Sequence, residues 1–338
     1  MAAQDIAVTE STQVAGARRA AVRIAVELDF DETAQGQLAL VVTEIATNLV
    51  KHARGGRVVL SPFREAGETG VDVCGMDSGP GMPNFAECLR DGYSTAGSPG
   101  NGLGAIRRLS AETDVFTVPL QGTVIRARCL ADTRKSIPLS RFDAGGIVVP
   151  FPGCSESGDA WSWRTSPDGL AVLVVDGLGH GPEAADAAQA AVDAFQGKPG
   201  LSGGLLLEHM DGALRGTRGA AVAIAEIAPG RGELSFWGVG NIAGVVLDGT
   251  SSQRLVSING IVGNRIGKVR QFTYAWTSNS ILVLHTDGVR TKWHLGDYSG
   301  LQTKSAAIIA AVLWRDSNRG TDDSTVVAVR ERGIGHGP

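Results

Sequence analysis

The stretch Glu44-Ile-Ala-Thr-Asn48-Leu-Val-Lys-His52 decides how the first third of the chain is interpreted. It belongs to a run in which apolar residues recur every three or four positions, namely Leu38, Val41, Val42, Ile45 and Leu49. That spacing predicts a helix over residues 32–52, and Asp31 can cap its start. Glu44 and Asn48 are four residues apart, so they lie on one face of this helix.

A carboxylate and an amide at this spacing suit a site that holds Mg²⁺ against phosphate groups. Mg²⁺ keeps several of its waters and takes only one or two protein oxygens, and the amide oxygen of Asn48 can serve without adding charge. The Glu44 carboxylate is then available as a base toward an attacking hydroxyl group or water. Taken alone, the same pattern also fits an ordinary polar helix surface, and His52 is interpreted as structural.

Two glycine-containing segments follow this helix. Asp77-Ser-Gly79-Pro-Gly81 comes after a predicted strand, where its carboxylate can either read the exocyclic amine of a purine or form a simple turn. Gly100-Asn-Gly102-Leu-Gly104 precedes a predicted helix, so its backbone amides can point at phosphates. This second segment follows a polar loop, whereas a dinucleotide-binding fingerprint follows a strand. The sequence also contains no Walker A motif.

The order of these motifs, continued by Gly122-Thr123, resembles the ATP-binding domain of the GHKL superfamily. The likeness is greatest to the small anti-sigma-factor serine kinases that phosphorylate STAS-domain antagonists. It covers roughly the first 130 residues, a normal domain length. The resemblance implies ATP and Mg²⁺ as cofactors, with Glu44 as catalytic base, Asn48 as Mg²⁺ ligand, Asp77 as adenine contact and Thr123 near the adenine. It also implies a lid and phosphate loop shaped by Gly79, Gly81, Gly100, Gly102 and Gly104.

The polar, proline-containing stretch 131–143 predicts a linker. Beyond it, strand-like and helix-like runs alternate: strands at 170–175, 220–227, 233–239, 280–285 and 325–329, and helices at 182–195, 205–214 and 305–314. We therefore expect domains at residues 1–130 and 144–331, followed by a tail at 332–338.

Acidic residues stand at the ends of the second-half strands: Asp159, Asp176, Asp287, Asp322 and Asp323. One Asp-Gly after a strand is usually a turn, but strand ends in a sandwich can converge on one pocket. Packed carboxylates repel one another unless cations lie among them, and hard oxygen ligands favour Mg²⁺ or Mn²⁺ over zinc. Two such ions about 4 Å apart could activate a bridging water and clamp a phosphoryl group.

The sequence around these residues resembles the SpoIIE-like branch of the metal-dependent PPM serine/threonine phosphatases. The matching pieces are Gly158-Asp159, Asp176-Gly177-Leu-Gly-His180-Gly181, Gly238-Val-Gly240-Asn241, Thr286-Asp287-Gly288 and Asp322-Asp323-Ser-Thr325. The resemblance implies two Mn²⁺ or Mg²⁺ ions held by the carboxylates of Asp159, Asp176, Asp287 and Asp322 and by the carbonyl of Gly177. Asp323 is a further metal candidate, although the family often has a neutral amide at that position.

Two further residues near these motifs bear on the chemistry. Ser162 stands where many relatives carry another Asp, so this chain departs from the family at a position linked to a third metal. His180 can be interpreted as a general acid or as a packing residue in the loop before the next helix, and packing is favoured. Trp161 and Trp163 alternate with polar residues, which indicates a strand beside the site.

These patterns predict an α+β protein of two domains, an N-terminal GHKL (Bergerat) α/β sandwich and a C-terminal PPM-type α-β-β-α sandwich. The expected function is bifunctional regulation: serine kinase activity together with phosphoserine or phosphothreonine hydrolysis, acting on STAS-domain anti-sigma antagonists in a stress response. A sigma factor is a second expected partner. Two alternatives remain open at this stage. The N-terminal domain could only sense nucleotide, or the protein could bind sigma or anti-sigma factors without catalysis.

The composition of the chain excludes several classes of protein and of binding partner. The 338 residues are 43% hydrophobic and 20% charged, which is typical of a folded globular protein. A net charge of -4 argues against nucleic acid or an anionic membrane as the main partner. The four cysteines form no Cys-x-x-Cys pair, which disfavours a zinc knuckle. The sequence shows no secretory signal and no apolar run long enough to span a bilayer, so we expect a cytoplasmic location.

Overall fold

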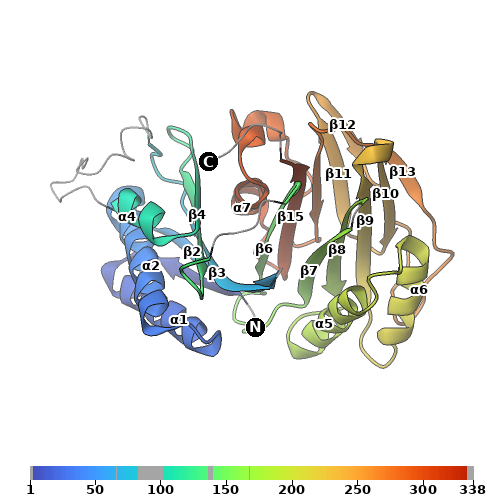
Figure 1. Ribbon diagram of the computed structural model, residues 1–338, viewed down its shortest axis with the longest axis horizontal. Coiled ribbons are helices and arrows are strands. Elements are labelled where there is room, and N and C mark those ends of the chain that lie inside the picture. Colours follow the sequence, from blue (N-terminus) through green and yellow to red (C-terminus); the bar gives the residue numbers. More distant parts are fainter. Residues whose placement is uncertain (1–2, 66, 83–101, 136–139, 167, 333–338) are drawn as a thin grey trace. The chain divides into compact units, whose positions relative to one another are not determined.

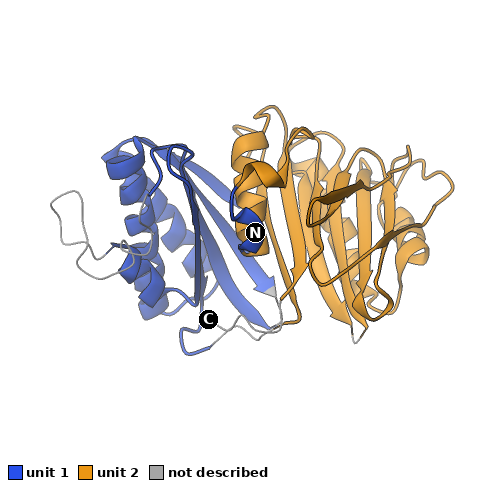
Figure 2. Cartoon of the chain, turned by 90° about the horizontal axis from the view of Figure 1, so that it is seen from above, with its two compact units in different colours: residues 1–139, 299–304 blue, residues 140–298, 305–338 orange. Residues whose placement is uncertain are grey.

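The computed structural model describes residues 3–65, 67–82, 102–135, 140–166 and 168–332. The chain divides into two compact units, one of residues 1–139 with 299–304 and one of residues 140–298 with 305–338 (Figure 2). The stretch predicted as a linker spans this division, and the first strand of the second unit begins within it, at Phe142.

The first unit is an antiparallel sheet with helices packed on one face (Figure 1). The strands lie in the order β1-β2-β3-β5-β4. Their bounds are β1 Gln4–Val8, β2 Gly56–Glu65, β3 Glu68–Met76, β4 Glu112–Thr117 and β5 Thr123–Leu130. The helices are α1 Ser11–Glu27, α2 Glu32–Ala53 and α4 Gly102–Leu109. This arrangement confirms the predicted α/β sandwich.

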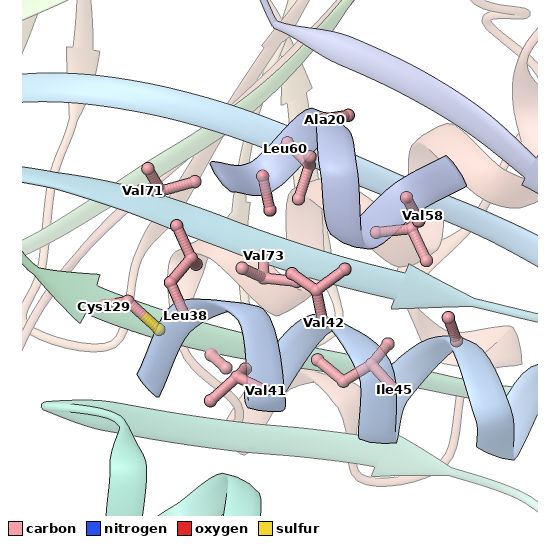
Figure 3. Close-up of a cluster of buried hydrophobic side chains, with 14 of the residues drawn as sticks. Ala20, Leu38, Val41, Val42, Ile45, Val58, Leu60, Val71, Val73 and Cys129 are labelled. Carbon is pink, nitrogen blue, oxygen red and sulfur yellow. The ribbon is translucent and has the colours of Figure 1, made fainter. Parts of the chain in front are cut away.

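Helix α2 forms where its cap and its apolar stripe predict it. The Asp31 carboxylate accepts a hydrogen bond from the Ala34 backbone N–H at 2.8 Å, which satisfies one of the unpaired donors of the first turn. The buried stripe packs against the sheet (Figure 3), with Leu38, Val41, Val42 and Ile45 among Val58, Leu60, Val71 and Val73. The apolar stripe therefore fixes the rotation of α2 and leaves Glu44 and Asn48 half-buried.

The second unit contains two further sheets. One has the order β13-β10-β9-β8-β7, and the other has the order β12-β11-β14-β15-β6. The strands are β6 Phe142–Val149, β7 Asp159–Ser166, β8 Gly169–Gly177, β9 Ala220–Ala228, β10 Glu233–Val239, β11 Ala243–Asp248, β12 Ser251–Arg254, β13 Phe272–Ala275, β14 Ile281–His285 and β15 Ser324–Glu331. The helices are α5 Pro182–Gly197, α6 Gly203–Ala213 and α7 Ala306–Ser317, with 3₁₀ turns at Pro229–Arg231, Leu295–Asp297 and Leu301–Thr303.

The two sheets of the second unit pack face to face between layers of helix (Figure 1). One core lies between the sheets and includes Val172 and Val174 with Leu284 and Val327. A second core lies between α5, α6 and the first sheet, while α7 packs on β6 and β15. The layers are therefore helix, sheet, sheet and helix, as the sequence predicts. None of the helices in the described segments has the length and apolar character that crossing a bilayer requires.

A network of charged side chains joins three strands of the first unit. The Asp72 carboxylate accepts hydrogen bonds from Arg126 Nε at 3.1 Å and from Arg128 Nε at 2.9 Å. Arg126 Nη1 also donates to Glu112 Oε2 at 3.1 Å. Burial alone would raise the pKa of Asp72, but Arg126 and Arg128 outweigh it and lower the pKa to about 2. The network therefore stabilises the fold through the ionised form of Asp72.

Replacing Asp72 with Asn is expected to destabilise the first unit by about 2 kcal/mol at pH 7. Because the pKa of Asp72 is lowered in the folded state, this stabilisation is present above the ordinary pKa of about 3.9. It is lost as pH falls from there to about 2. Urea unfolding at a series of pH values should therefore show a wild-type advantage that shrinks toward acid.

The positions of the tryptophans allow urea unfolding of the two units to be followed separately in the whole chain. All 6 tryptophans lie between Trp161 and Trp314, in the second unit, so their fluorescence reports that unit while circular dichroism reports both. A wild-type advantage that is constant from pH 7 to pH 3 would contradict the assignment to Asp72.

Candidate active sites

The first candidate site lies where α2 meets the start of α4. A Cβ atom placed on Gly102 would lie 2.9 Å from Glu44 Oε2 and 3.8 Å from Asn48 Oδ1. A larger residue at position 102 would require the Glu44 side chain to shift, so glycine allows this close approach of the backbone. Asn48 and Gly102, which are 54 positions apart in the chain, therefore lie close together.

Asp77 is fixed at the end of β3 by its neighbours on β5. Its Oδ1 atom accepts hydrogen bonds from the backbone N–H of Gly79 at 2.8 Å and of Thr123 at 3.2 Å. The Asp77 N–H in turn donates to the Thr123 carbonyl at 2.9 Å. Gly122 has φ +82°, and a side chain there would collide with the Asp77 carbonyl. The carboxylate is thus held in one orientation beside Thr123.

The other glycines of the predicted nucleotide site lie close by or outside the described residues. Gly81 comes four residues after Asp77 with φ +67°, and a side chain there would collide with the Val118 carbonyl. Gly104 is buried in α4. Gly100 lies outside the described residues. The loop glycine Gly81 therefore packs against the same hairpin that carries Thr123, while Gly104 belongs to the helix that begins beside Glu44.

The second candidate site begins with two aspartates on neighbouring strands. Asp159 opens β7 and Asp176 lies near the end of β8, and the two residues are direct partners in the antiparallel ladder. Asp159 is only 4% exposed. The N–H of Gly177 donates to the Gly158 carbonyl at 2.9 Å, which extends the pairing beyond the strand end. Two of the predicted metal ligands are therefore side by side.

The other acidic residues come from the opposite sheet. Asp287 follows β14 and Asp322 precedes β15, and a side chain on Gly288 would collide with the Asp323 carbonyl. The two loops therefore touch. Asn241 supports this arrangement, because its Nδ2 donates to Asp287 Oδ2 at 2.7 Å.

The acidic residues of this cluster raise one another's pKa values. Burial first, and then the charge of Asp176, raise the pKa of the Asp159 carboxyl. Burial, followed by the charges of Asp287, Asp322 and Asp323, raises the pKa of Asp176 to about 7. A bound cation would relieve this repulsion.

The carboxylate oxygens of this cluster suit hard divalent cations, each of which would bind to a few of them directly. Within the described residues, no three side chains of His, Cys, Asp or Glu are already arranged to hold a metal ion. Mg²⁺ commonly uses one or two carboxylates and fills its remaining positions with water. The paired Asp159 and Asp176 carboxylates suit that mode better than a closed cage of side chains.

Asp323 differs from the other predicted ligands in its surroundings. Its Oδ1 accepts from the Phe151 N–H at 2.7 Å and its Oδ2 accepts from the Gly158 N–H at 2.9 Å. It is only 3% exposed. Both oxygens therefore hold the β6–β7 connection, which positions Asp159, and a neutral amide could keep part of this role.

The residues next to these motifs make contacts within the second unit. His180 is exposed and stacks on Phe151 with ring centroids 4.7 Å apart. Ser162 accepts a hydrogen bond from Gln196 Nε2 at 2.6 Å, linking β7 to α5. Trp161 and Trp163 lie on β7 and pack against the core between the sheets, as their strand pattern predicts.

Comparison with known proteins identifies the first unit. Residues 7–129 match the family described as a histidine kinase-like ATPase domain. The serine/threonine-protein kinase RsbT of Bacillus subtilis (strain 168) is 31% identical over 114 residues, which cover 34% of this chain and 86% of RsbT. The chain belongs to the histidine kinase-like ATPase family.

The second unit of this ATPase family member matches a different group. Residues 166–332 match the family of stage II sporulation protein E (SpoIIE). The phosphoserine phosphatase RsbX of Bacillus subtilis (strain 168) is 25% identical over 139 residues, which cover 40% of this chain and 69% of RsbX. The chain thus joins an RsbT-type kinase-like domain to a SpoIIE-type PP2C phosphatase domain.

Solved structures share the fold of more than half of this chain. One, from work on the bacterial stressosome as a modular system adapted to control secondary messenger signaling, has TM-score 0.53 and 23% identity. It covers 56% of this chain and 100% of its own. The structure of RsbX in complex with magnesium has TM-score 0.52 and 21% identity, covering 58% of this chain and 98% of RsbX. PP2C-type neighbours of this chain therefore include one that binds Mg²⁺.

Proposed function

We propose that this chain both phosphorylates and dephosphorylates serine or threonine residues of partner-switching proteins, using separate sites in its two units. The substrate class proposed for both sites is a STAS-domain antagonist of an anti-sigma factor. The observation that carries the phosphatase half is the ladder pairing of Asp159 with Asp176 beside Asp287 and Asp322. The likeness to RsbT and RsbX, a kinase and a phosphoserine phosphatase, supports the same assignment.

In the first unit, residues of α2 and β3 would bind and orient ATP. Asp77, held by Gly79 and Thr123, would accept a hydrogen bond from the adenine amine. Asn48 would hold Mg²⁺, which supplies charge neutralisation for the phosphates when bound. Glu44, beside Gly102, would orient the acceptor hydroxyl and take its proton.

In the second unit, the acidic residues would hold two Mn²⁺ or Mg²⁺ ions through Asp159, Asp176, Asp287, Asp322 and the carbonyl of Gly177. When bound, such ions lower the pKa of a water and neutralise the phosphoryl oxygens. Asp323 would hold the backbone that carries Asp159 in place, and Asn241 would orient Asp287. No covalent intermediate with a protein side chain is required.

The phosphatase half is tested on the full chain with a phosphoserine-containing STAS-domain protein. Purified protein freed of metal is expected to release no phosphate, and addition of Mn²⁺ or Mg²⁺ is expected to start release. ATP is left out, so the first unit cannot rephosphorylate the substrate. Absence of hydrolysis with either metal, from a protein that shows a normal unfolding transition by tryptophan fluorescence, would reject the phosphatase assignment.

A further inference from the structure

A buried hydroxyl group connects the two sheets of the second unit at the acidic cluster. Thr286 is 0% exposed and follows β14 in one sheet. Its Oγ1 donates to Asp159 Oδ2, on β7 of the other sheet, at 2.7 Å. The same Oγ1 accepts a hydrogen bond from the Thr325 N–H on β15 at 2.9 Å. One side chain thus links β7, β14 and β15.

The two hydrogen bonds together fix the direction of the hydroxyl proton. The Thr325 N–H can only donate, so Thr286 Oγ1 is the acceptor in that bond and directs its own single proton to Asp159. The Thr286 backbone is held as well, because its N–H donates to the Thr325 carbonyl at 3.1 Å. The donor that faces Asp159 is therefore rigid.

A rigid donor on one oxygen restricts rotation of the Asp159 carboxylate. The backbone of Asp159 is already fixed by its ladder pairing with Asp176 and by a hydrogen bond from its N–H to Ser157 Oγ at 3.1 Å. The Thr286 contact restricts the remaining freedom, which is the rotation of the side chain. Groups that hold a ligating side chain in its binding orientation are worth about 10- to 100-fold in metal affinity.

We propose that Thr286 is a positioning residue for the divalent metal site and that it holds Asp159 in the orientation that binds the ion. This inference rests on the proposed phosphatase function and adds a determinant of metal affinity to it. In this role Thr286 would not itself be a metal ligand. It acts through Asp159, and the same hydroxyl ties the sheet that carries Asp159 to the sheet that carries Asp287.

The test compares variants that differ in the hydroxyl group. Thr286→Val keeps the side-chain shape, and the pair Thr286→Ser and Thr286→Ala differs only in the hydroxyl group. Mn²⁺ binding to the full chain is measured by titration calorimetry without substrate. We expect Thr286→Val and Thr286→Ala to weaken Mn²⁺ binding by about 10- to 100-fold, and Thr286→Ser to stay within about threefold of wild type.

A control variant removes another hydrogen bond from a threonine to an aspartate, at an exposed position. Thr277 Oγ1 donates to Asp248 Oδ2 at 3.0 Å, away from the acidic cluster, so Thr277→Val is expected to leave Mn²⁺ binding unchanged. Tryptophan fluorescence verifies that each variant folds. If Thr286→Val does not fold, the Ser and Ala variants decide the question.

The outcomes separate this inference from the function on which it rests. Equal Mn²⁺ affinity of wild type and a folded Thr286→Val or Thr286→Ala variant would overturn the positioning role alone. Equal weakening in Thr286→Ser and Thr286→Ala would also overturn it, because the hydroxyl would then be irrelevant. Wild-type protein that binds no Mn²⁺ and hydrolyses no phosphoserine would reject the phosphatase site itself.

Discussion

Replacing Asp176 with Asn is expected to lower metal-dependent phosphoserine hydrolysis on the order of 10³-fold, about 4 kcal/mol in activation free energy. Asp176 pairs with Asp159 and lies among the charges of Asp287, Asp322 and Asp323. Asparagine keeps the shape of the side chain but removes the negative charge that would hold the ions. Initial rates of phosphate release at several Mn²⁺ concentrations measure the effect.

The same substitution should not weaken the metal-free fold. The raised pKa of Asp176, about 7, means that burial and neighbouring carboxylates disfavour its charged form in the folded protein. A neutral Asn relieves this repulsion, so the metal-free variant is expected to unfold at the same temperature as wild type or higher. The stabilisation that Mn²⁺ gives wild type should disappear.

Asp193→Asn provides the matched control for this experiment. Asp193 is exposed on α5 and accepts a hydrogen bond from Gln189 at 2.8 Å, so the variant removes a carboxylate from the same unit outside the cluster. It should retain wild-type hydrolysis. A fully active Asp176→Asn variant would show that the acidic cluster is not the hydrolytic site.

Replacing Glu44 with Gln is expected to lower phosphoryl transfer from ATP to a STAS-domain protein by about 10²- to 10⁴-fold. The glutamine amide could still accept a hydrogen bond from the substrate hydroxyl but could not take its proton. ATP binding should change little, because the residues that would hold the adenine, Asp77 and Thr123, are untouched. Transfer of labelled γ-phosphate and ATP titration calorimetry separate the two effects.

The kinase experiment is best carried out in the Asp176→Asn background, so that the second unit does not remove the transferred phosphate. Glu32→Gln, in the first turn of the same helix, is the matched control and should leave transfer unchanged. Transfer that is unaffected by Glu44→Gln would exclude Glu44 as the base. ATP binding without any transfer by the Asp176→Asn parent would favour nucleotide sensing by the first unit.

Local sequence signals predicted most of the regular structure. The predicted helix at 32–52 is α2, Glu32–Ala53, because a capping residue and an apolar stripe coincide there. The strand predicted at 233–239 is β10, Glu233–Val239, because Leu234, Phe236 and Val239 supply buried apolar positions in a short segment. In such segments the local pattern and the buried face agree.

Two strands without a prediction, β6 and β12, have weak local patterns. Strand β12, Ser251–Arg254, is polar and exposed along its whole length, so only its pairing with β11 defines it. Strand β6 begins in the polar stretch that resembles a linker and is defined by pairing with β15. These segments form strands because they pair with other strands, and the sequence of each segment alone does not contain that information.

In the candidate sites, too, local sequence signals identify some of the residues while long-range contacts are seen only in the fold. The resemblance assigns Glu44, Asn48 and Gly102 to one predicted site, and the strand ends suggest another with Asp159 and Asp176. The structure brings Gly102 beside Glu44 and pairs Asp159 with Asp176. The contact from Thr286 to Asp159 joins residues that are 127 positions apart, so no local spacing signals it. The motif Thr286-Asp287-Gly288 contains the residue, but only the fold shows which carboxylate its hydroxyl meets.

The acidic cluster contains residues from both sheets of the sandwich, so the packing of the two layers affects its geometry. Asp159 and Asp176 belong to strands of one sheet, while Asp287 and Asp322 border strands of the other. The apolar side chains between the layers, including Val174 and Leu284, therefore separate the sheet of Asp159 and Asp176 from the sheet that Asp287 and Asp322 border. The spacing of the two sheets therefore determines how far the Asp159–Asp176 pair lies from Asp287 and Asp322.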